Sequence, residues 1–260
     1  MIEIFQQFNQ EIEEEKNFQQ TIKTSIVQGK KIARQIRIIL NDIHSKNSDI
    51  ESICKKVKEF YSPLSLVFDS LYSIIPSNKF FKYYSFFKKF SSEIISYILL
   101  VHFFETGDLL TKEEIEKLLL QPDTQECINK ESNNIEEEKN EKKEELQKQL
   151  QIKEKVQISQ TNKKTKRNFQ VYDYLIGIIS MSTELSRYCI NCVRSQEFEL
   201  PFKIGEFLNN INSGLKLLNF PNKQFNKHLG SFNYSLKSVE QVLYDLQKIQ
   251  QFKEILLTQK

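Results

Sequence analysis

The chain has 260 residues, and its 37 basic side chains nearly balance its 34 acidic ones, so the formal net charge is only +3. This length is sufficient to bury a substantial hydrophobic core. The chain contains 6 glycines and 5 prolines, far below the roughly 12% that the two residues together contribute to average proteins. Sandwiches, barrels and Rossmann-type sheets need many glycine turns, so the composition favours an all-α fold. The small net charge argues against tight wrapping of duplex DNA by one chain.

No segment resembles a secretory signal or a membrane span. The first five residues carry no basic stretch, unlike a signal peptide. The longest apolar run, residues 94–104, is interrupted by Ser96 and His102 and is much shorter than the roughly 20 residues of a transmembrane helix. The cysteines are too scattered for a disulfide framework. We therefore expect an intracellular, cytoplasmic protein.

Apolar residues recur at helical spacing along the first half of the chain. A first helix is predicted over 2–44, and a second begins at the Ser48–Asp49 cap and runs towards Ile75. Pro63 should kink or divide that second helix, because proline lacks the backbone N–H. A third helix follows Pro76–Ser77 and ends before Gly107. A capping box formed by Thr111 and Glu114 predicts a short fourth helix.

Three more helices are predicted in the second half, over 174–193, over 201–218 and after Pro221. The last helix carries an apolar seam of alternating four- and three-residue spacing, made of Phe232, Leu236, Val239, Leu243 and Leu246. Residues 121–168 contain no aromatic residue but 11 basic and 10 acidic side chains. Such a stretch cannot bury enough apolar surface to offset its ordering entropy, so it is predicted to be a disordered charged insert. The whole chain, 1–260, is interpreted as one domain of seven helices.

The third helix combines lysines with aromatic residues over 79–90. This pattern has two interpretations that the residues alone leave open. Lysines and exposed rings form single-stranded nucleic-acid surfaces, where rings stack on unpaired bases. An amphipathic core helix with aromatic residues on one face gives the same pattern. A second cluster, Lys55, Lys56 and Lys58, becomes relevant to binding only if it lies near Lys82 and Lys88 in the assembled protein. The basic run 163–167 is either a linker, a phosphate tether or a nuclear-import signal, which leaves nuclear localisation open.

The residues with catalytic chemistry are few and dispersed. Cys189 and Cys192 have redox-motif spacing, but they lie inside a predicted helix without further ligands, so we interpret both as packing residues. No glycine-rich phosphate loop or nucleophile elbow occurs. Glu93 on the third helix and Glu184 on the fifth could face each other and hold a Mg²⁺ ion. This pair is the one candidate for catalysis.

Several segments, taken in chain order, resemble the translin family. They are Thr-Glu-Leu-Ser-Arg at 183–187, Ser-Gly-Leu-Lys-Leu-Leu-Asn at 213–219 and Val-Glu-Gln-Val-Leu-Tyr-Asp-Leu at 239–246. The first half agrees in Ile4–Phe5, Ala33–Arg34, His44, Cys54 and Pro76. The resemblance covers nearly the whole chain outside the insert. The balance favours translin, although features such as residues 101–103 are more similar to the second branch, translin-associated factor X.

The resemblance implies a seven-helix subunit that assembles into a hollow, octamer-like shell and binds single-stranded RNA and DNA. It also implies a partner subunit of the translin-associated factor X type. The two together form a Mg²⁺-dependent endoribonuclease in RNA silencing. The four metal-binding positions of the X-type subunit correspond here to Glu93, Ser96, Ser180 and Glu184. Only two of them are acidic, which weakens the charge that would activate a metal-bound water.

The family's nucleic-acid residues on the third helix correspond to Lys82, Tyr84, Phe86 and Lys88. The resemblance favours Lys82 and Lys88 as phosphate contacts, with Lys56 and Lys58 as further candidates. We therefore expect an oligomeric protein that binds single-stranded RNA and DNA in a shared cavity, needs no cofactor and takes part in RNA processing. The alternatives are a Mg²⁺-dependent endoribonuclease subunit that uses Glu93 and Glu184, and an adaptor whose terminal seam recruits a partner.

Overall fold

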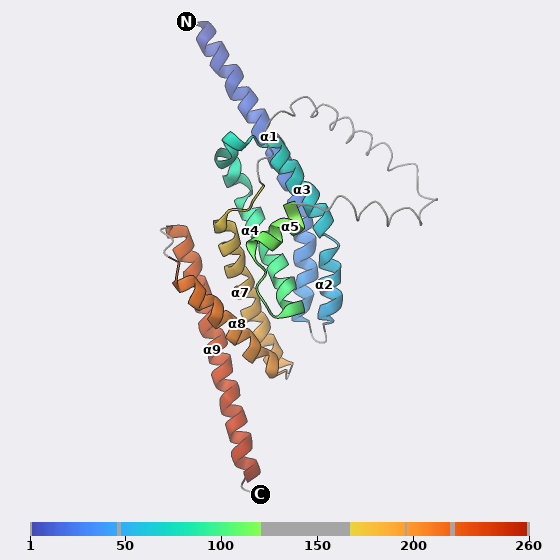
Figure 1. The fold of residues 1–260 in the computed structure, drawn as a ribbon, viewed down its shortest axis with the longest axis vertical. Helices are drawn as coiled ribbons and strands as arrows, with labels where there is room; N and C mark the ends of the chain where they lie inside the picture. Colours follow the sequence, from blue (N-terminus) through green and yellow to red (C-terminus); the bar gives the residue numbers. More distant parts are fainter. Residues whose placement is uncertain (1, 46–47, 121–166, 196, 219–221, 259–260) are drawn as a thin grey trace, which may run out of the picture.

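The computed structural model describes residues 2–45, 48–120, 167–195, 197–218 and 222–258. These residues form α-helices and two short 3-10 helices, with no strand among them, so the all-α prediction is confirmed (Figure 1). The α-helices are α1 (Ile2–Asn41), α2 (Ile50–Lys58), α3 (Tyr61–Ile74), α4 (Phe80–Thr106), α5 (Lys112–Leu120), α7 (Val171–Arg194), α8 (Glu199–Lys216) and α9 (Lys223–Thr258). The predicted charged insert lies outside the described residues except for Arg167 and Asn168.

The helix boundaries follow local signals in the sequence. Asp49 caps α2 by accepting a hydrogen bond from the backbone N–H of Ser52 at 3.2 Å. The predicted second helix is divided into α2 and α3, and Pro63 lies in the first turn of α3, where a missing N–H costs nothing. Gly107 ends α4 in the left-handed conformation, with a φ of 81°. The predicted capping box opens α5, because Thr111 N–H donates to Glu114 at 2.8 Å and Glu114 N–H donates to the Thr111 hydroxyl.

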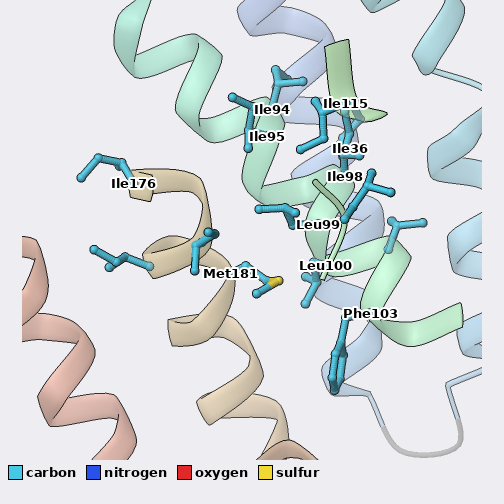
Figure 2. Close-up of a cluster of buried hydrophobic side chains, with 14 of the residues drawn as sticks. Ile36, Ile94, Ile95, Ile98, Leu99, Leu100, Phe103, Ile115, Ile176 and Met181 are labelled. Carbon is cyan, nitrogen blue, oxygen red and sulfur yellow. The ribbon is translucent and has the colours of Figure 1, made fainter. Parts of the chain in front are cut away.

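The hydrophobic core is centred on α4. This helix packs against α7 on one side and α1 on the other, and Figure 2 shows its isoleucines and leucines, with Ile36 of α1 and Met181 of α7 close by. Gly177 allows α7 to approach α4 closely, because a Cβ there would lie 2.5 Å from Cγ2 of Ile95. The core therefore fixes α4 and α7 side by side over most of their length.

The residues before α7 are attached to α3 and α5. Arg167 forms an ion pair with Asp69, and the Tyr72 hydroxyl donates to the carbonyl of Asn168 at 2.7 Å. Phe169 is buried, and its backbone N–H donates to the carboxylate of Glu116 at 2.8 Å. These contacts anchor the chain where it enters α7, although Arg167 and Asn168 were assigned to the disordered insert.

The long helices α1 and α9 project beyond the bundle at opposite ends (Figure 1). On the projecting part of α1, four apolar side chains lie on the surface, with exposed fractions of 54% for Ile4, 63% for Phe5, 51% for Phe8 and 52% for Ile12. The predicted seam of α9 packs instead within the subunit, against α7 and α8. Its residues Phe232, Leu236, Val239 and Leu246 are buried. No helix in the described part of the chain contains an apolar stretch of the length needed to span a lipid bilayer.

Candidate nucleic-acid interface

A pocket of about 930 Å³ lies between α1, α4, α7 and α9. Residues of α7 that lie about one helical turn apart line the pocket, from Tyr172 to Arg187. These two residues are about 22 Å apart along the helix axis, from the rise of 1.5 Å per residue. The four positions carried over from the translin family all line this pocket, namely Glu93, Ser96, Ser180 and Glu184. Residues that are distant in sequence therefore meet at one site.

The pocket is positively charged, in contrast to the nearly neutral chain. Five basic side chains and two acidic ones line it, and these are Arg37, Lys88, Lys89, Arg187, Lys227, Glu93 and Glu184. His228 of α9 also lines the pocket, and its side chain is exposed. Like charges gathered in a concave surface raise the local concentration of an oppositely charged ligand. The arrangement therefore attracts anions.

Glu93 is neutralised by α1. Arg37 forms an ion pair with its carboxylate and donates from Nε to the Tyr97 hydroxyl at 2.9 Å. That hydroxyl donates in turn to Glu93 at 2.7 Å. Hydrogen bonding to Tyr97 and the neighbouring Glu93 charge raise the pKa of Arg37. Glu93 is thus part of a closed network rather than a free ligand.

Glu184 is held in a similar way by α7 and by the 3-10 helix Asp42–His44. Arg187 donates to its carboxylate at 2.8 Å, and Nε2 of His44 lies 3.4 Å from it. The amide nitrogen of Asn191 lies 2.9 Å from Nδ1 of His44. With this amide as donor, the neutral ring carries its proton on Nε2, facing Glu184. Burial and the charge of Arg187 lower the pKa of His44 and so favour this neutral form.

The pocket offers a poor set of ligands for Mg²⁺. Its two carboxylates are each bound to an arginine, and the Ser96 hydroxyl donates to the Glu93 carbonyl at 2.7 Å. Among the described residues, no group of three or more His, Cys, Asp or Glu side chains is placed to share a metal ion. A divalent cation would also face the positive charges of the pocket. The metal role of Glu93 and Glu184 stays a prediction.

Three lysines of the pocket make no ion pair with any described residue. Lys88 and Lys89 belong to α4, and Lys227 belongs to α9. The ammonium of Lys88 lies 5.9 Å from the centre of the Tyr172 ring, a cation–π distance. Lys89 and Lys227 are exposed. These side chains can bind phosphates without first breaking a salt bridge.

The other candidates on the aromatic helix lie elsewhere. Lys82 is 2.8 Å from Glu15 of α1 and lies in a separate hollow between these two helices. Hydrogen bonds from Lys82 and Tyr83 lower the pKa of Glu15 to about 2. Phe86 is half-buried, with the ammonium of Lys23 5.5 Å from its ring centre. Lys82 and Phe86 are therefore placed away from the pocket that contains Lys88.

Tyr84 joins α4 to α7 instead of forming an exposed stacking surface. Its hydroxyl donates to the carboxylate of Asp173, which is only 1% exposed. Burial raises the pKa of Asp173 to about 7, although Tyr84 and the nearby charge of Lys88 oppose this shift. This hydrogen bond links α4 to α7 next to Tyr172, which lines the pocket.

The second lysine cluster does not join the pocket. Lys58 forms an ion pair with Glu105 at the C-terminal end of α4, at 2.7 Å. Lys56 is exposed on α2, a helix that contributes no lining residue. Within one subunit this cluster therefore lies apart from Lys88, and its role in the assembled protein stays a prediction.

Four basic residues of the pocket were absent from the predicted binding set. Arg37 and Lys227 belong to no recognisable sequence motif. Their neighbours in the pocket come from other helices that are distant in the sequence. Arg187 ends the Thr-Glu-Leu-Ser-Arg segment used for the family resemblance, and Lys89 belongs to the run of lysines and aromatic residues. Both of these could have been included from the sequence.

Cys189 and Cys192 are packing residues. Both thiols are buried on α7. Burial raises the pKa of Cys189 to about 12 and that of Cys192 to about 11. A redox-active cysteine needs the opposite shift, towards the thiolate.

Comparisons with known proteins find a matching family and a matching fold. A model of the Translin family matches residues 19–248. Translin of Mus musculus is 24% identical over 247 residues, which cover 94% of this chain and 91% of that protein. Translin-associated protein X of Mus musculus is 29% identical over 155 residues, 59% of this chain and 47% of that protein. A solved structure titled "Crystal structure of apo-NeC3PO" shares the fold with a TM-score of 0.59 and 12% identity, over 93% of this chain and 96% of that one.

Proposed function

The chain belongs to the translin family, and from this premise we propose that it is an oligomeric protein that binds single-stranded RNA and DNA. The observation that carries the proposal is the pocket between α1, α4, α7 and α9, with five basic and two acidic side chains. Arg37 and Arg187 compensate the two carboxylates, which leaves Lys88, Lys89 and Lys227 for phosphates. A modest charge per chain becomes a strongly positive inner surface when several copies surround a common cavity.

A charge-matched pair of triple variants tests this proposal. The pocket variant changes Lys88, Lys89 and Lys227 to Gln. The control changes Lys203, Lys216 and Lys237, which are exposed and lie outside the pocket, to Gln. Both variants remove three positive charges, so a general effect of net charge would weaken both equally.

Binding of a labelled single-stranded oligonucleotide is measured by fluorescence anisotropy over a range of salt concentrations. Each phosphate contact to a single strand contributes about 0.7 to the slope of log K against log salt. The pocket variant should bind more weakly, with a slope reduced by about 2, whereas the control keeps the slope of the unmodified protein. Equal slopes in both variants would refute the pocket as the binding site.

Self-association is supported by the projecting part of α1. Ile4, Phe5, Phe8 and Ile12 are more than half exposed on it, and an apolar stripe of this kind on a projecting helix is typical of a protein interface.

We also propose that a subunit of the translin-associated factor X type joins the assembly, and that the complex acts in RNA processing and silencing. Mass measurement by light scattering, with and without such a subunit, tests the assembly.

A second candidate function is supported by the position of Glu93 and Glu184. Both line the same pocket, as a Mg²⁺-dependent endoribonuclease subunit would require. Incubation of the purified protein with single-stranded RNA and Mg²⁺ distinguishes the two functions. Cleavage that is lost in a Glu184→Gln variant would favour the enzyme, whereas intact RNA that stays bound would favour the binding protein.

A further inference from the structure

The lining of the pocket has two chemically different parts. Its charged side chains include exposed ones, such as Lys89, Lys227 and Arg37. Its apolar lining residues Leu40, Ile43, Leu100, Ile176 and Met181 are almost completely buried and form a hydrophobic floor. Figure 2 shows Leu100 of α4 and Met181 of α7 pointing towards each other. The pocket therefore combines a charged rim with an apolar floor.

The floor is unsuited to a phosphate. A phosphate placed there would lose its hydration against apolar side chains that offer no hydrogen bond in return, which opposes binding. A flat, largely apolar ring suits this surface better. Ser180 and Asn41 line the same pocket, and their side chains make no hydrogen bond to another described residue. They can therefore pair with the polar edge of such a ring.

The pocket has room for such a ring together with part of the strand that carries it. Sites for small organic ligands usually have volumes of about 300–1,000 Å³, and this pocket has about 930 Å³. In a duplex, each base is stacked and paired inside the helix and must be extruded before it can enter a pocket, which costs a few kcal/mol. A single strand has bases that are already unpaired.

We propose that the pocket takes one unpaired base of a bound strand against its apolar floor, while Lys88, Lys89 and Lys227 hold the neighbouring phosphates. This inference rests on the proposed function and adds what the pocket recognises. If it holds, the pocket of each subunit selects single strands over duplexes, whatever the shape of the assembly. Charge at the rim supplies attraction, and the floor supplies selection for a base.

The test uses two strands of the same length and charge. One is an oligodeoxythymidine, and the other is a matched abasic strand that has the sugar-phosphate backbone without bases. The unmodified protein should bind the thymidine strand roughly 10-fold more tightly, because covering one face of a base, about 50 Å² of largely apolar surface at about 25 cal/mol per Å², corresponds to a factor of this size. Equal affinities would overturn the inference while leaving the proposed function intact. Absence of binding to either strand at low salt would instead refute the proposed function.

A variant that covers the floor locates the effect. Ser180→Leu adds an aliphatic side chain next to the floor without changing the charge and without adding a ring on which a base could stack, and Ser213→Leu on the exposed surface of α8 is the matched control. Ser180→Leu should reduce the affinity for the thymidine strand towards that for the abasic strand, whose binding stays unchanged. Ser213→Leu should change neither. If Ser180→Leu retains the full preference for bases, or loses both strands equally while keeping its helical circular dichroism, the inference is wrong. The smaller Ser180→Val variant serves if the leucine variant does not fold.

Discussion

The buried carboxylate of Asp173 should give the protein a distinctive dependence of stability on pH. Asp173 is 1% exposed and accepts a hydrogen bond from Tyr84, and burial raises its pKa from 3.8 to about 7. In the unfolded chain the same carboxyl ionises near its ordinary pKa. Between these two values the folded state binds more protons than the unfolded state. The contribution of Asp173 to the free energy of unfolding must therefore fall as the pH rises from about 4 to about 7.

The size of this effect follows from the shift. One pKa unit corresponds to 1.36 kcal/mol, so a shift of about three units destabilises the folded protein by about 4 kcal/mol above pH 7 compared with pH 4. An Asp173→Asn variant keeps an oxygen that accepts the Tyr84 hydrogen bond but does not ionise. The variant should gain about 4 kcal/mol relative to the unmodified protein over this pH range.

Urea unfolding followed by circular dichroism at several pH values measures this difference. All other titrating groups are shared by the two proteins, so their contributions cancel in the comparison. If the asparagine amide destabilises the variant by the same amount at every pH, the free energy of unfolding of the variant shifts as a whole. The change with pH in the difference between the two proteins stays the same. If the free energies of unfolding of the two proteins stay parallel from about pH 4 to about pH 8, the account of Asp173 is refuted.

Two further predictions concern the core of α7. Gly177→Ala should lower the free energy of unfolding, because its new Cβ would lie 2.5 Å from Ile95 and overpacking of about 1–3 kcal/mol exceeds the gain of about 1 kcal/mol from the better helix propensity of alanine. Urea denaturation measures the net loss, and a variant more stable than the unmodified protein would show that α4 and α7 are not in such close contact. Cys189 and Cys192 should react with a thiol reagent only after unfolding, since burial keeps them protonated. Rapid modification of either thiol in the native protein would contradict their assignment to the core.

Local features of the fold could be predicted because neighbouring residues determine them. The caps at Asp49, Thr111 and Gly107 each depend on contacts within a few residues, and all three occur where the sequence indicates. The division of the second helix likewise follows from Pro63. The helical periodicity of apolar residues also predicted the seam of α9. It did not show whether this seam packs within the subunit, as it does against α7 and α8, or against another protein.

The site was harder to predict, because its charges depend on tertiary structure. The ion pair between Arg37 and Glu93 joins residues of different helices, and no spacing rule connects them. The sequence could have shown that Lys82 and Lys88 lie on different faces of their helix, since six residues at 100° each place them about 120° apart around the helix axis. The structure shows this separation, because Lys82 contacts α1 and Lys88 lines the pocket with α7.

Photo-crosslinking tests most directly whether the pocket between α1, α4, α7 and α9 is where a strand binds. A single-stranded RNA that contains 4-thiouridine is irradiated in complex with the protein, and the linked peptides are identified by mass spectrometry. The account predicts crosslinks in α4, α7 and α9, at residues that line the pocket such as Tyr97, Tyr172 and Met181. Crosslinks confined to α2 or to the hollow around Lys82 would contradict it.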